Sequence, residues 1–399
     1  KTGGRFDLAV AVGILAANRE FPPRAVRDVE IYGELALDGT LRAIPGLLPS
    51  VIKARDAGRH VIVPRENAAE ATLAQATVFA ATDLREVADH LAGRAPIEPA
   101  EAAPLAVGDR RYPELLDVKG QQLAKRALEI AAAGFHNVLL IGPPGTGKSM
   151  LARRLPGILP PMSEQEALDT ASVCSIAGTP VAPANWLGRP FRAPHHTASA
   201  AALVGGGRTL SPGEISRAHN GVLFMDELPE YNRTVLEALR EPLETGSVRI
   251  ARAGAQADFP ARFQLVAAMN PCPCGYLGDE KSDCRCSRDR VVAYRNKVSG
   301  PLLDRIDLHV EVLRPSTAVL RDGEPGAECT AAVARRVAQA RQLSAERSGV
   351  PNALLEGDAL AETCPLDDKC WALLETAADR FNLSARAHQR VLRVARTIA

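Results

Sequence analysis

The chain has 399 residues, of which 46% are apolar and 24% are charged, and its formal net charge is +1. This length gives room for about two or three domains. The charge excludes a chain that is basic throughout, so a nucleic-acid contact has to come from a local patch or from a ring that concentrates charge.

Cysteine usage and apolar segments bear on the location of the protein. Eight cysteines, half of them in one short cluster, argue against a secreted disulfide framework and favour a reducing compartment. The longest apolar segment, 8–17, is too short to span a bilayer, and no segment resembles a signal peptide. We therefore expect a cytoplasmic protein without a membrane partner. The chain starts at Lys1 and stops inside an expected helix at Ala399, so we also expect both ends to be truncated relative to the natural protein.

Residues 1–92 alternate helix-like and strand-like patterns, with a hairpin turn at Asp38-Gly39. The expected elements are a helix at 6–17, strands at 29–37 and 60–64, and a helix at 83–91. This order, with a Gly-Glu-Leu strand, a turn and a Pro-Gly-Leu-Leu helix start, resembles the Lon-protease-like domain. The nucleophilic serine of that domain would fall near Arg5 and its activating lysine at Leu48, so neither half of the catalytic dyad is present. We expect a scaffold or a nucleic-acid-contact module rather than a peptidase.

Residues 93–111, rich in Ala, Pro and Glu, are expected to form a linker to a second domain at 112–315. That domain contains Gly-Pro-Pro-Gly-Thr-Gly-Lys-Ser at 142–149, between a strand-like apolar run and a helix pattern. This setting is that of a phosphate-binding loop, whose glycines let backbone N–H groups point at phosphate oxygens. Lys148 would reach the β and γ phosphates, and the Ser149 hydroxyl would ligate Mg²⁺. The residues assigned to ATP and its Mg²⁺ are Gly142, Pro143, Pro144, Gly145, Thr146, Gly147, Lys148, Ser149, Met150 and Asp226.

Two segments follow the phosphate loop. A capping box at 163–166 predicts a helix that runs to about Ile176. Residues 191–208 lack the period of any long element and are expected to be an inserted loop. The pair His195-His196 in this loop could ligate a metal, but no carboxylate or cysteine is near in sequence, which favours an ordinary polar loop.

An apolar strand at 221–225 ends in two acidic residues. In a phosphate-loop enzyme the first acid holds Mg²⁺ through water and the second polarises the attacking water, so these roles go to Asp226 and Glu227. The pattern is common by itself, and its position after Lys148 makes it specific.

A helix at 231–243 precedes residues 248–254 and 259–268, which are expected to form a hairpin that runs into a third core strand ending at Asn270. The Asn270 side chain can orient water against the γ phosphate. Arg249 and Arg252 lie near the hairpin turn, where they either grip a phosphate backbone or are simply solvated.

A cysteine cluster follows Asn270 directly. Two Cys-x-Cys arms in a Gly- and Asp-rich loop can close a tetrahedral Zn²⁺ site in a segment with little apolar surface, although their spacing is tighter than usual and unligated thiols are the alternative. The candidate ligands are Cys272, Cys274, Cys284 and Cys286.

The remaining chain is expected to pass through a lone arginine, Arg305, into a strand, and then to form a helical lid at 316–399. Its last helix is capped by Ser384 and carries three arginines at helical spacing on one side. Arg386 lies in the first turn, where a lid could aim it at phosphate. For Arg390 and Arg393 a solvated basic face is the alternative.

Taken together, these residues resemble the competence-protein ComM/YifB family, also called magnesium-chelatase-like AAA+ ATPases. The motifs that carry the resemblance are Gly-Pro-Pro-Gly-Thr-Gly-Lys-Ser-Met, Arg-Ala-Pro-His-His, Phe-Met-Asp-Glu-Leu-Pro-Glu-Tyr, Asn-Pro-Cys-Pro-Cys-Gly, Pro-Leu-Leu-Asp-Arg-Ile-Asp-Leu-His and Leu-Ser-Ala-Arg-Ala. The resemblance implies an α/β AAA+ P-loop core with a C-terminal helical lid, preceded by the Lon-like α+β domain. By it, Asn270 is the first sensor, Arg305 the arginine finger given to a neighbouring subunit and Arg386 the second sensor.

The family also implies ATP-dependent homohexamers whose hairpins project into the pore of a ring. Such rings move on DNA and drive branch migration of recombination intermediates in natural transformation. An arginine supplied across an interface gives the physical reason for a ring, since it completes charge neutralisation at the transferred phosphoryl group. Two alternatives share the same core: a magnesium-chelatase-type ATPase subunit, which the Lon-like front and the cysteine loop disfavour, and a protein-remodelling ATPase.

Overall fold

The computed structural model describes residues 4–102, 112–207, 210–252, 255–322 and 326–399. The chain divides into two compact units, one made of Lys1–Arg110 with Met162–Gly188 and the other of Arg111–Pro161 with Arg189–Ala399. The expected division at the linker therefore has to be corrected, because 162–188 belongs with the front unit although it lies inside the predicted ATPase domain.

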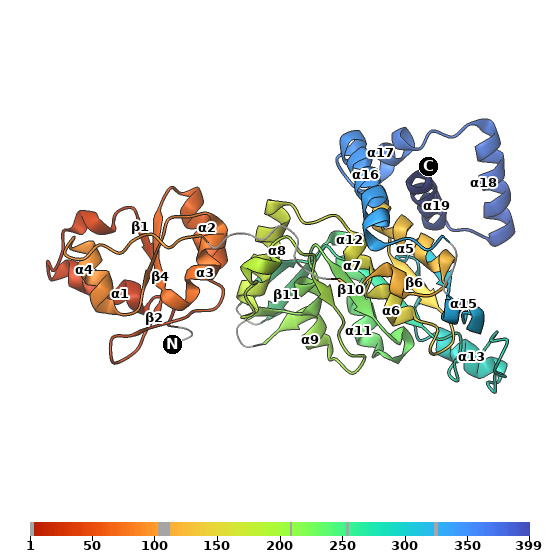
Figure 1. Cartoon of the computed structure of the whole chain (residues 1–399), viewed down its shortest axis with the longest axis horizontal. Helices are drawn as coiled ribbons and strands as arrows, with labels where there is room; N and C mark the ends of the chain where they lie inside the picture. Colours follow the sequence, from red (N-terminus) through yellow and green to blue (C-terminus); the bar gives the residue numbers. More distant parts are fainter. Residues whose placement is uncertain (1–3, 103–111, 208–209, 253–254, 323–325) are drawn as a thin grey trace. The chain divides into compact units, whose positions relative to one another are not determined.

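A parallel sheet with the strand order β1-β4-β5 forms the centre of the front unit (Figure 1). Its strands are β1 (Val29–Ile31), β4 (His60–Pro64) and β5 (Val78–Ala81), and the main helices around it are α1 (Asp7–Ala17), α2 (Leu48–Asp56) and α4 (Leu84–Leu91). The predicted strand at 29–37 is interrupted. Its first part, β1, pairs with β4, while β2 (Glu34–Leu35) pairs antiparallel with β3 (Leu41–Arg42) around the predicted Asp38-Gly39 turn.

The positions of the missing dyad carry structural side chains. The Arg5 guanidinium donates to the carbonyls of Pro45 and Gly46 at 2.7 and 2.8 Å, and Leu48 is completely buried at the start of α2. Arg5 and Leu48 therefore fix the start of α2, and they provide neither a nucleophile nor a base.

Helix α8 (Glu164–Ile176) attaches the inserted segment to the front unit. It opens with the predicted capping box, in which Ser163 and Glu166 bond each other's backbone N–H. At its other end the Ser175 carbonyl accepts from the Gly46 N–H at 2.9 Å, and apolar side chains of the segment join the core beneath α2.

Part of the predicted linker is also folded onto the front unit. The Ala100 N–H donates to the Val78 carbonyl at 2.7 Å, and the Ile97 N–H donates to His90 Nδ1 at 2.9 Å. Residues 93–102 therefore line the edge of β5, and 103–111 lie outside the described residues.

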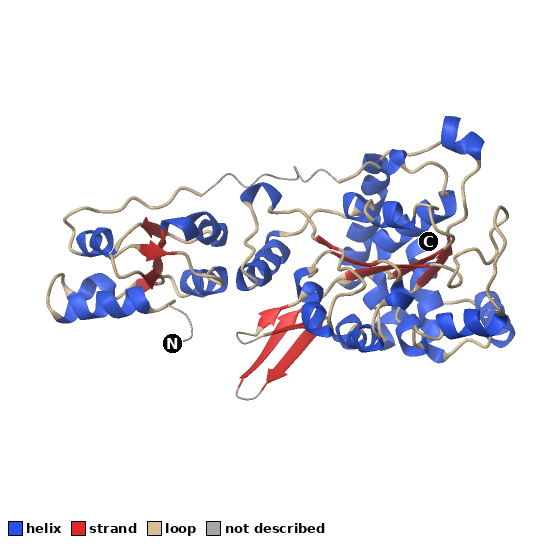
Figure 2. Cartoon of the chain, turned by 90° about the horizontal axis from the view of Figure 1, so that it is seen from below, coloured by secondary structure: helices blue, strands red, loops and turns tan. Residues whose placement is uncertain are grey.

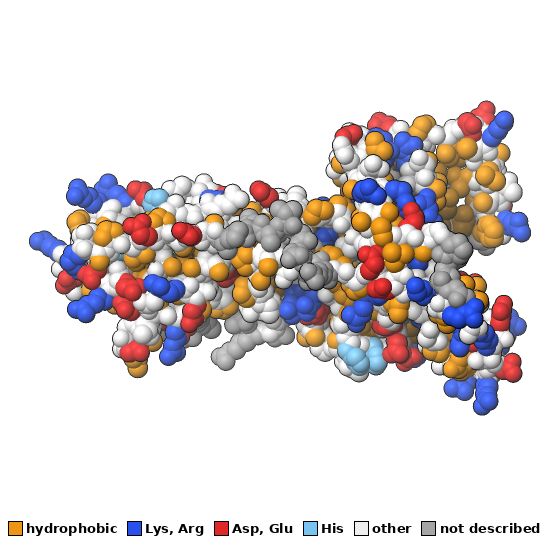
Figure 3. All heavy atoms as spheres, in the orientation of Figure 1, with side chains coloured by type: hydrophobic (Ala, Val, Ile, Leu, Met, Phe, Trp, Pro, Cys, Tyr) orange, Lys and Arg blue, Asp and Glu red, His pale blue; other side chains and the backbone are white. Residues whose placement is uncertain are grey.

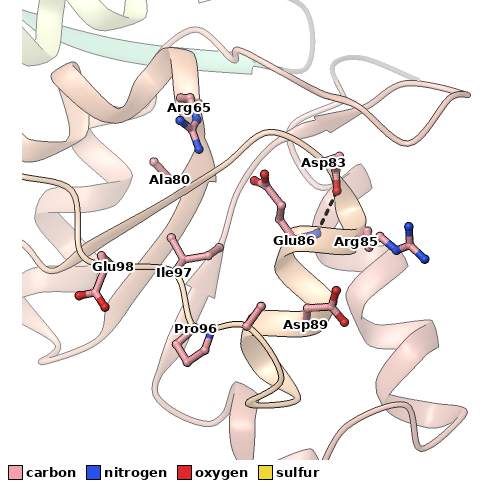
Figure 4. Close-up of a pocket in the computed structure, with 10 residues that line it drawn as sticks. Arg65, Ala80, Asp83, Arg85, Glu86, Asp89, Pro96, Ile97 and Glu98 are labelled. Carbon is pink, nitrogen blue, oxygen red and sulfur yellow. Dashed lines mark hydrogen bonds between the residues drawn. The ribbon is translucent and has the colours of Figure 1, made fainter.

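A hollow of about 550 Å³ lies between α4 and residues 95–98 (Figure 4). Three of its four acidic groups serve the local fold. The Asp83 carboxylate caps α4 by accepting from the Glu86 N–H at 2.9 Å, and Glu86 accepts from the Thr82 N–H at 2.8 Å. Asp89 accepts from Arg94 at 2.7 Å. We assign no chemistry to this hollow.

The second unit is built on a five-stranded parallel sheet with the order β14-β6-β13-β10-β7. The strands are β14 (Leu308–Glu311), β6 (Val138–Ile141), β13 (Gln264–Met269), β10 (Val222–Met225) and β7 (Phe191–Arg192). Helices cover both faces, and the α/β fold class predicted from the sequence is confirmed (Figure 1). The carboxyl ends of the parallel strands meet at one edge, where ligands bind in such folds.

The prediction of a loop at 191–208 is wrong. Its first residues form β7, which pairs with β10, and α9 (Ala200–Val204) follows. A two-residue strand shows no periodicity, so only its pairing reveals it. The predicted helix at 231–243 is also divided, into α11 (Arg233–Ala238) and α12 (Arg240–Thr245), because Pro242 has no N–H to continue the hydrogen-bond ladder.

The C-terminal residues form the predicted helical lid. Its helices are α15 (Thr317–Asp322), α16 (Thr330–Ser348), α17 (Gly357–Thr363), α18 (Asp368–Phe381) and α19 (Ala385–Ile398). Helices α16 and α19 pack on α5 (Gln122–Gly134), and Val333 and Val337 are buried as their spacing predicts. Nowhere in the described part of the chain is a helix both long and apolar enough to cross a membrane.

Candidate nucleotide site

The phosphate loop connects β6 to α6 (Lys148–Ala152) at the carboxyl edge of the sheet. Gly145 and Gly147 have φ values of +78° and +94°, in the left-handed region that favours glycine. At Gly142 a Cβ atom would lie 2.2 Å from the Val312 carbonyl oxygen, so no larger residue fits there. These glycines keep the loop close to the sheet with its backbone free to face phosphate.

Lys148 lies at the centre of the loop and is buried. Its ammonium group donates to the carbonyls of Gly142 and Pro143 at 2.6 and 2.9 Å and to Asn270 Oδ1 at 3.2 Å. Burial lowers the pKa of Lys148, and the nearby carboxylates of Asp226 and Glu227 oppose that shift. Gly142 and Pro143 thus contribute to the phosphate loop by holding the Lys148 side chain in place.

The acidic pair lies directly beside the loop, at the end of β10. Asp226 Oδ2 accepts from the Ser149 hydroxyl at 2.6 Å, so two oxygen donors of the kind that Mg²⁺ prefers lie side by side. Glu227 has a φ of +52°, which turns the chain sharply after the strand, and its N–H donates to Asp226 Oδ1 at 3.0 Å.

These groups surround one cavity of about 400 Å³, within the range of small-molecule sites. The structure therefore brings together most of the predicted nucleotide residues. The cavity is lined by Pro144, Gly145, Thr146, Gly147, Lys148, Ser149, Met150, Asp226, Glu227, Met269 and Asn270.

Arg305 and Arg386 lie elsewhere, in a second cavity of about 460 Å³. Arg305 Nη2 donates to Glu244 Oε2 at 2.5 Å, and Arg386 Nη2 lies 3.9 Å from Glu244 Oε1. The Arg305 guanidinium, together with Arg386, lowers the pKa of Glu244. Neither arginine lines the cavity of its own phosphate loop.

The other two arginines of α19 are structural. Arg390 Nη1 donates to the carbonyls of Leu303 and Ile306 at 3.2 and 2.9 Å, and Arg393 Nε donates to the Leu355 carbonyl at 2.7 Å. A solvated basic face is therefore wrong for both residues.

Comparison with known proteins identifies the family. Family models described as magnesium chelatase, subunit ChlI, and its C-terminal region match residues 114–320 and 327–399, and a model described as subunit ChlI of Mg-chelatase matches 1–67. Competence protein ComM of Haemophilus influenzae is 48% identical over 407 residues, which cover 100% of this chain and 79% of ComM. The chain belongs to the ComM/YifB family of magnesium-chelatase-like AAA+ ATPases.

Other relatives agree with this placement. YifB of Salmonella typhimurium is 47% identical over 407 residues, covering 100% of this chain and 78% of YifB. The magnesium-chelatase 67 kDa subunit of Heliobacterium mobile is 26% identical over 235 residues, covering 50% of this chain and 33% of that subunit. As a member of the ComM/YifB family, the chain is an AAA+ ATPase that uses ATP and Mg²⁺.

From the sequence, His196 is expected to lie in an ordinary polar loop. The structure places its Nδ1 3.1 Å from Glu227 Oε2. The backbone that carries it is held by Tyr231, whose buried hydroxyl donates to the Pro194 carbonyl at 2.6 Å and whose pKa is raised by burial. The ring of His195 lies beside that of His196, tilted by 33° with the ring centroids 4.2 Å apart. The missing carboxylate partner of the histidine pair is thus Glu227, distant in sequence and adjacent in space.

We predict that His196 orients the Glu227 carboxylate. Replacing His196 with alanine should lower ATP turnover about 10-fold, the effect of losing one close polar contact to a charged group, with ATP affinity unchanged. Steady-state kinetics and nucleotide binding test this, with His196→Gln expected to restore part of the rate. His195→Ala removes the ring that packs beside His196 and bonds Thr197 at 2.8 Å, and it should lower turnover less, which separates loss of packing from loss of the Glu227 contact. Unchanged turnover in His196→Ala would exclude the role.

The predicted hairpin is present, with β11 (Ser247–Arg252) antiparallel to β12 (Ala255–Pro260), but its second strand is separate from the core strand β13, which begins at Gln264. It projects away from the core sheet (Figure 2). Arg249 is neither free nor merely solvated, because its Nε donates to Asp258 Oδ1 on the opposite strand at 2.9 Å. The Arg252 side chain and the turn at 253–254, including Gly254, lie outside the described residues.

The four cysteines of the predicted zinc site come together as a cluster. All four Sγ atoms lie within 4.8 Å of one another. The Tyr276 backbone N–H, directed at Cys274, is the main cause that lowers the pKa of that thiol to about 6. The cluster can hold a metal ion.

Proposed function

We propose that the chain is a ring-forming ATP-driven motor on DNA, a helicase that drives branch migration of recombination intermediates in natural transformation. The ring is a homohexamer, ATP and Mg²⁺ serve hydrolysis, Zn²⁺ is held by the cysteine loop, and the DNA substrate implies a cytoplasmic location. A relative that covers the whole chain is named a competence protein, which supports a role with DNA.

The observation that carries the proposal is the separation of Arg305 and Arg386 from their own phosphate loop. Both guanidinium groups are gathered at Glu244, in a cavity distinct from the one that Lys148 lines. From this position the two guanidinium groups would complete the site of a triphosphate held in the corresponding cavity of an identical neighbour. Hydrolysis then depends on assembly.

Within that composite site each side chain has a task. The Glu227 carboxylate takes the proton of the attacking water, which Asn270 orients. Lys148 and the loop N–H groups offset charge on the β and γ phosphates, and Arg305 of the adjacent subunit offsets charge on the transferred phosphoryl group. Ser149 and, through water, Asp226 would hold Mg²⁺, which would supply positive charge against the charge that develops on the phosphates.

A short connection links this chemistry to the hairpin. Glu244 lies near the end of α12, and Gly246, with a φ of +68°, turns the chain directly into β11. When a phosphate of the neighbour draws Arg305 and Arg386 away from Glu244, the base of the hairpin loses an ion pair. Nucleotide state can therefore alter the element that would contact DNA.

Branch migration of a synthetic Holliday junction by the purified chain with ATP and Mg²⁺ tests the proposal. Intact ATPase activity without strand exchange or unwinding would remove the helicase function. Stimulation of hydrolysis by a protein client, and not by DNA, would instead favour a protein-remodelling ATPase.

We predict that the hairpin arginines contribute to the DNA contact. On the face drawn in Figure 3, acidic and basic side chains of the described residues are interspersed. Replacing Arg249 and Arg252 together with alanine should weaken single-strand binding about 10-fold, reduce its salt dependence and leave basal ATPase activity unchanged. Arg126→Ala, an exposed arginine paired with Glu129 at 2.9 Å, is the control. Equal DNA affinity in both variants would remove the hairpin contact.

A magnesium-chelatase-type ATPase subunit is the second candidate, because the matching family models carry that description. Co-purification with a porphyrin-chelating partner would favour it. Hydrolysis stimulated by DNA alone would count against it.

A further inference from the structure

The cysteine cluster has the dimensions of a single tetrahedral metal site. Cys272 Sγ lies 3.4 Å from Cys274 Sγ and 3.7 Å from Cys284 Sγ, and Cys274 Sγ lies 3.6 Å from Cys284 Sγ. Four sulfurs around one Zn²⁺ at about 2.3 Å are about 3.8 Å apart by tetrahedral geometry. A disulfide would require about 2.05 Å. The spacing therefore fits thiolates that share one ion.

The loop that carries the cluster has little else to organise it. Residues 270–287 are all described and form no helix or strand before α13 (Arg288–Arg295). Only Pro271, Cys272 and Gly275 of these residues are buried, and Cys272 is fully so. A segment with so little apolar surface gains its structure from a bound metal.

This loop is joined to the nucleotide site at two points. Along the chain, Cys272 follows two residues after Asn270, whose side chain accepts from the Lys148 ammonium group at 3.2 Å. Across space, Gly275 lies against the phosphate loop so closely that a Cβ atom on it would be 2.7 Å from Pro144 Cδ. At Gly275, with a φ of +89°, only glycine allows this approach without strain.

We propose that the four thiolates bind one Zn²⁺ and that this ion holds the loop 270–287 against the nucleotide site. We call this role a structural clip. The ion positions Asn270 from one side and supports Pro144 from the other. None of its ligands lines the ATP cavity, so the cysteines are positioning residues rather than catalytic ones. ATP hydrolysis in this chain then requires zinc in addition to Mg²⁺. The inference rests on the proposed roles of Lys148 and Asn270.

Metal content is the first measurement. The full chain, purified without added zinc, should contain about one zinc per chain by mass spectrometry of the elements. Cys286→Ser should lose it, while Cys370→Ser, at an exposed cysteine on α18 outside the cluster, should keep it. Absence of zinc and of any other transition metal from the wild-type chain would overturn the site. This readout does not depend on whether the chain acts on DNA, so it separates failure of the clip from failure of the motor proposal.

Turnover is the second measurement, made without DNA on the same preparations. Cys286→Ser should lower ATP hydrolysis about 10- to 100-fold, as loss of supporting groups does at other sites. Should that variant fail to fold by circular dichroism, stripping zinc from the wild-type chain with a thiol-reactive reagent and chelator, then re-adding reductant and Zn²⁺, gives the same comparison. Zinc loss with full hydrolysis would overturn the clip. The fold-decrease in ATP hydrolysis caused by Cys286→Ser should be smaller in an Asn270→Ala background. An equal fold-decrease in both backgrounds would show that the zinc ion does not act through Asn270.

Discussion

Replacing Glu227 with glutamine is expected to leave ATP bound and to lower its hydrolysis by about 10²- to 10⁴-fold, the contribution of a general base. The amide has nearly the shape of the carboxylate, so contacts of the loop with phosphate survive while the proton acceptor is lost. Nucleotide binding by calorimetry and phosphate release under saturating ATP measure the two effects separately.

Glu230→Gln is the matched control for this prediction. Glu230 lies in the same short helical turn (Leu228–Glu230) and pairs with Lys297 at 3.3 Å. It does not line the nucleotide cavity. Near-normal hydrolysis in Glu227→Gln would show that the base is another group.

Replacing Arg305 with alanine should lower hydrolysis by about 10³- to 10⁵-fold, the contribution of an arginine finger. In the isolated chain the Arg305 guanidinium bonds Glu244 and the Pro301 carbonyl, not its own phosphate loop. Loss of the Arg305 side chain should therefore slow hydrolysis only at the nucleotide site of a neighbouring subunit.

Mixing variants tests this geometry. Arg305→Ala rings should recover part of their activity when Lys148→Ala chains are added, because the second variant supplies a finger to sites that still hold an intact lysine. A Lys148→Ala/Arg305→Ala double variant should rescue nothing. Equal activity of both mixtures, with mixed rings confirmed by mass, would exclude a finger that acts across subunits.

The nucleotide cavity could largely be predicted from sequence because its parts are local. The phosphate loop has its own signature, and Asp226 and Asn270 directly follow strands β10 and β13, whose parallel pairing brings their ends to one edge. The hairpin, the cysteine cluster and the lid helices also have short-range patterns. The membership of residues 162–188 in the front unit could not be predicted, because α2, against which they pack, lies far away in the sequence.

What the sequence determined by itself is the chemistry of the ATP site and the order of the elements that carry it, since glycine spacing, strand ends and helix caps are properties of neighbouring residues. Only the tertiary structure decided which distant groups meet. It placed His196 at Glu227, gathered Arg305 and Arg386 at Glu244, and set Gly275 against Pro144. These contacts come from chain segments that approach one another through packing of the sheet, the lid and the loops, and no local pattern encodes such distances.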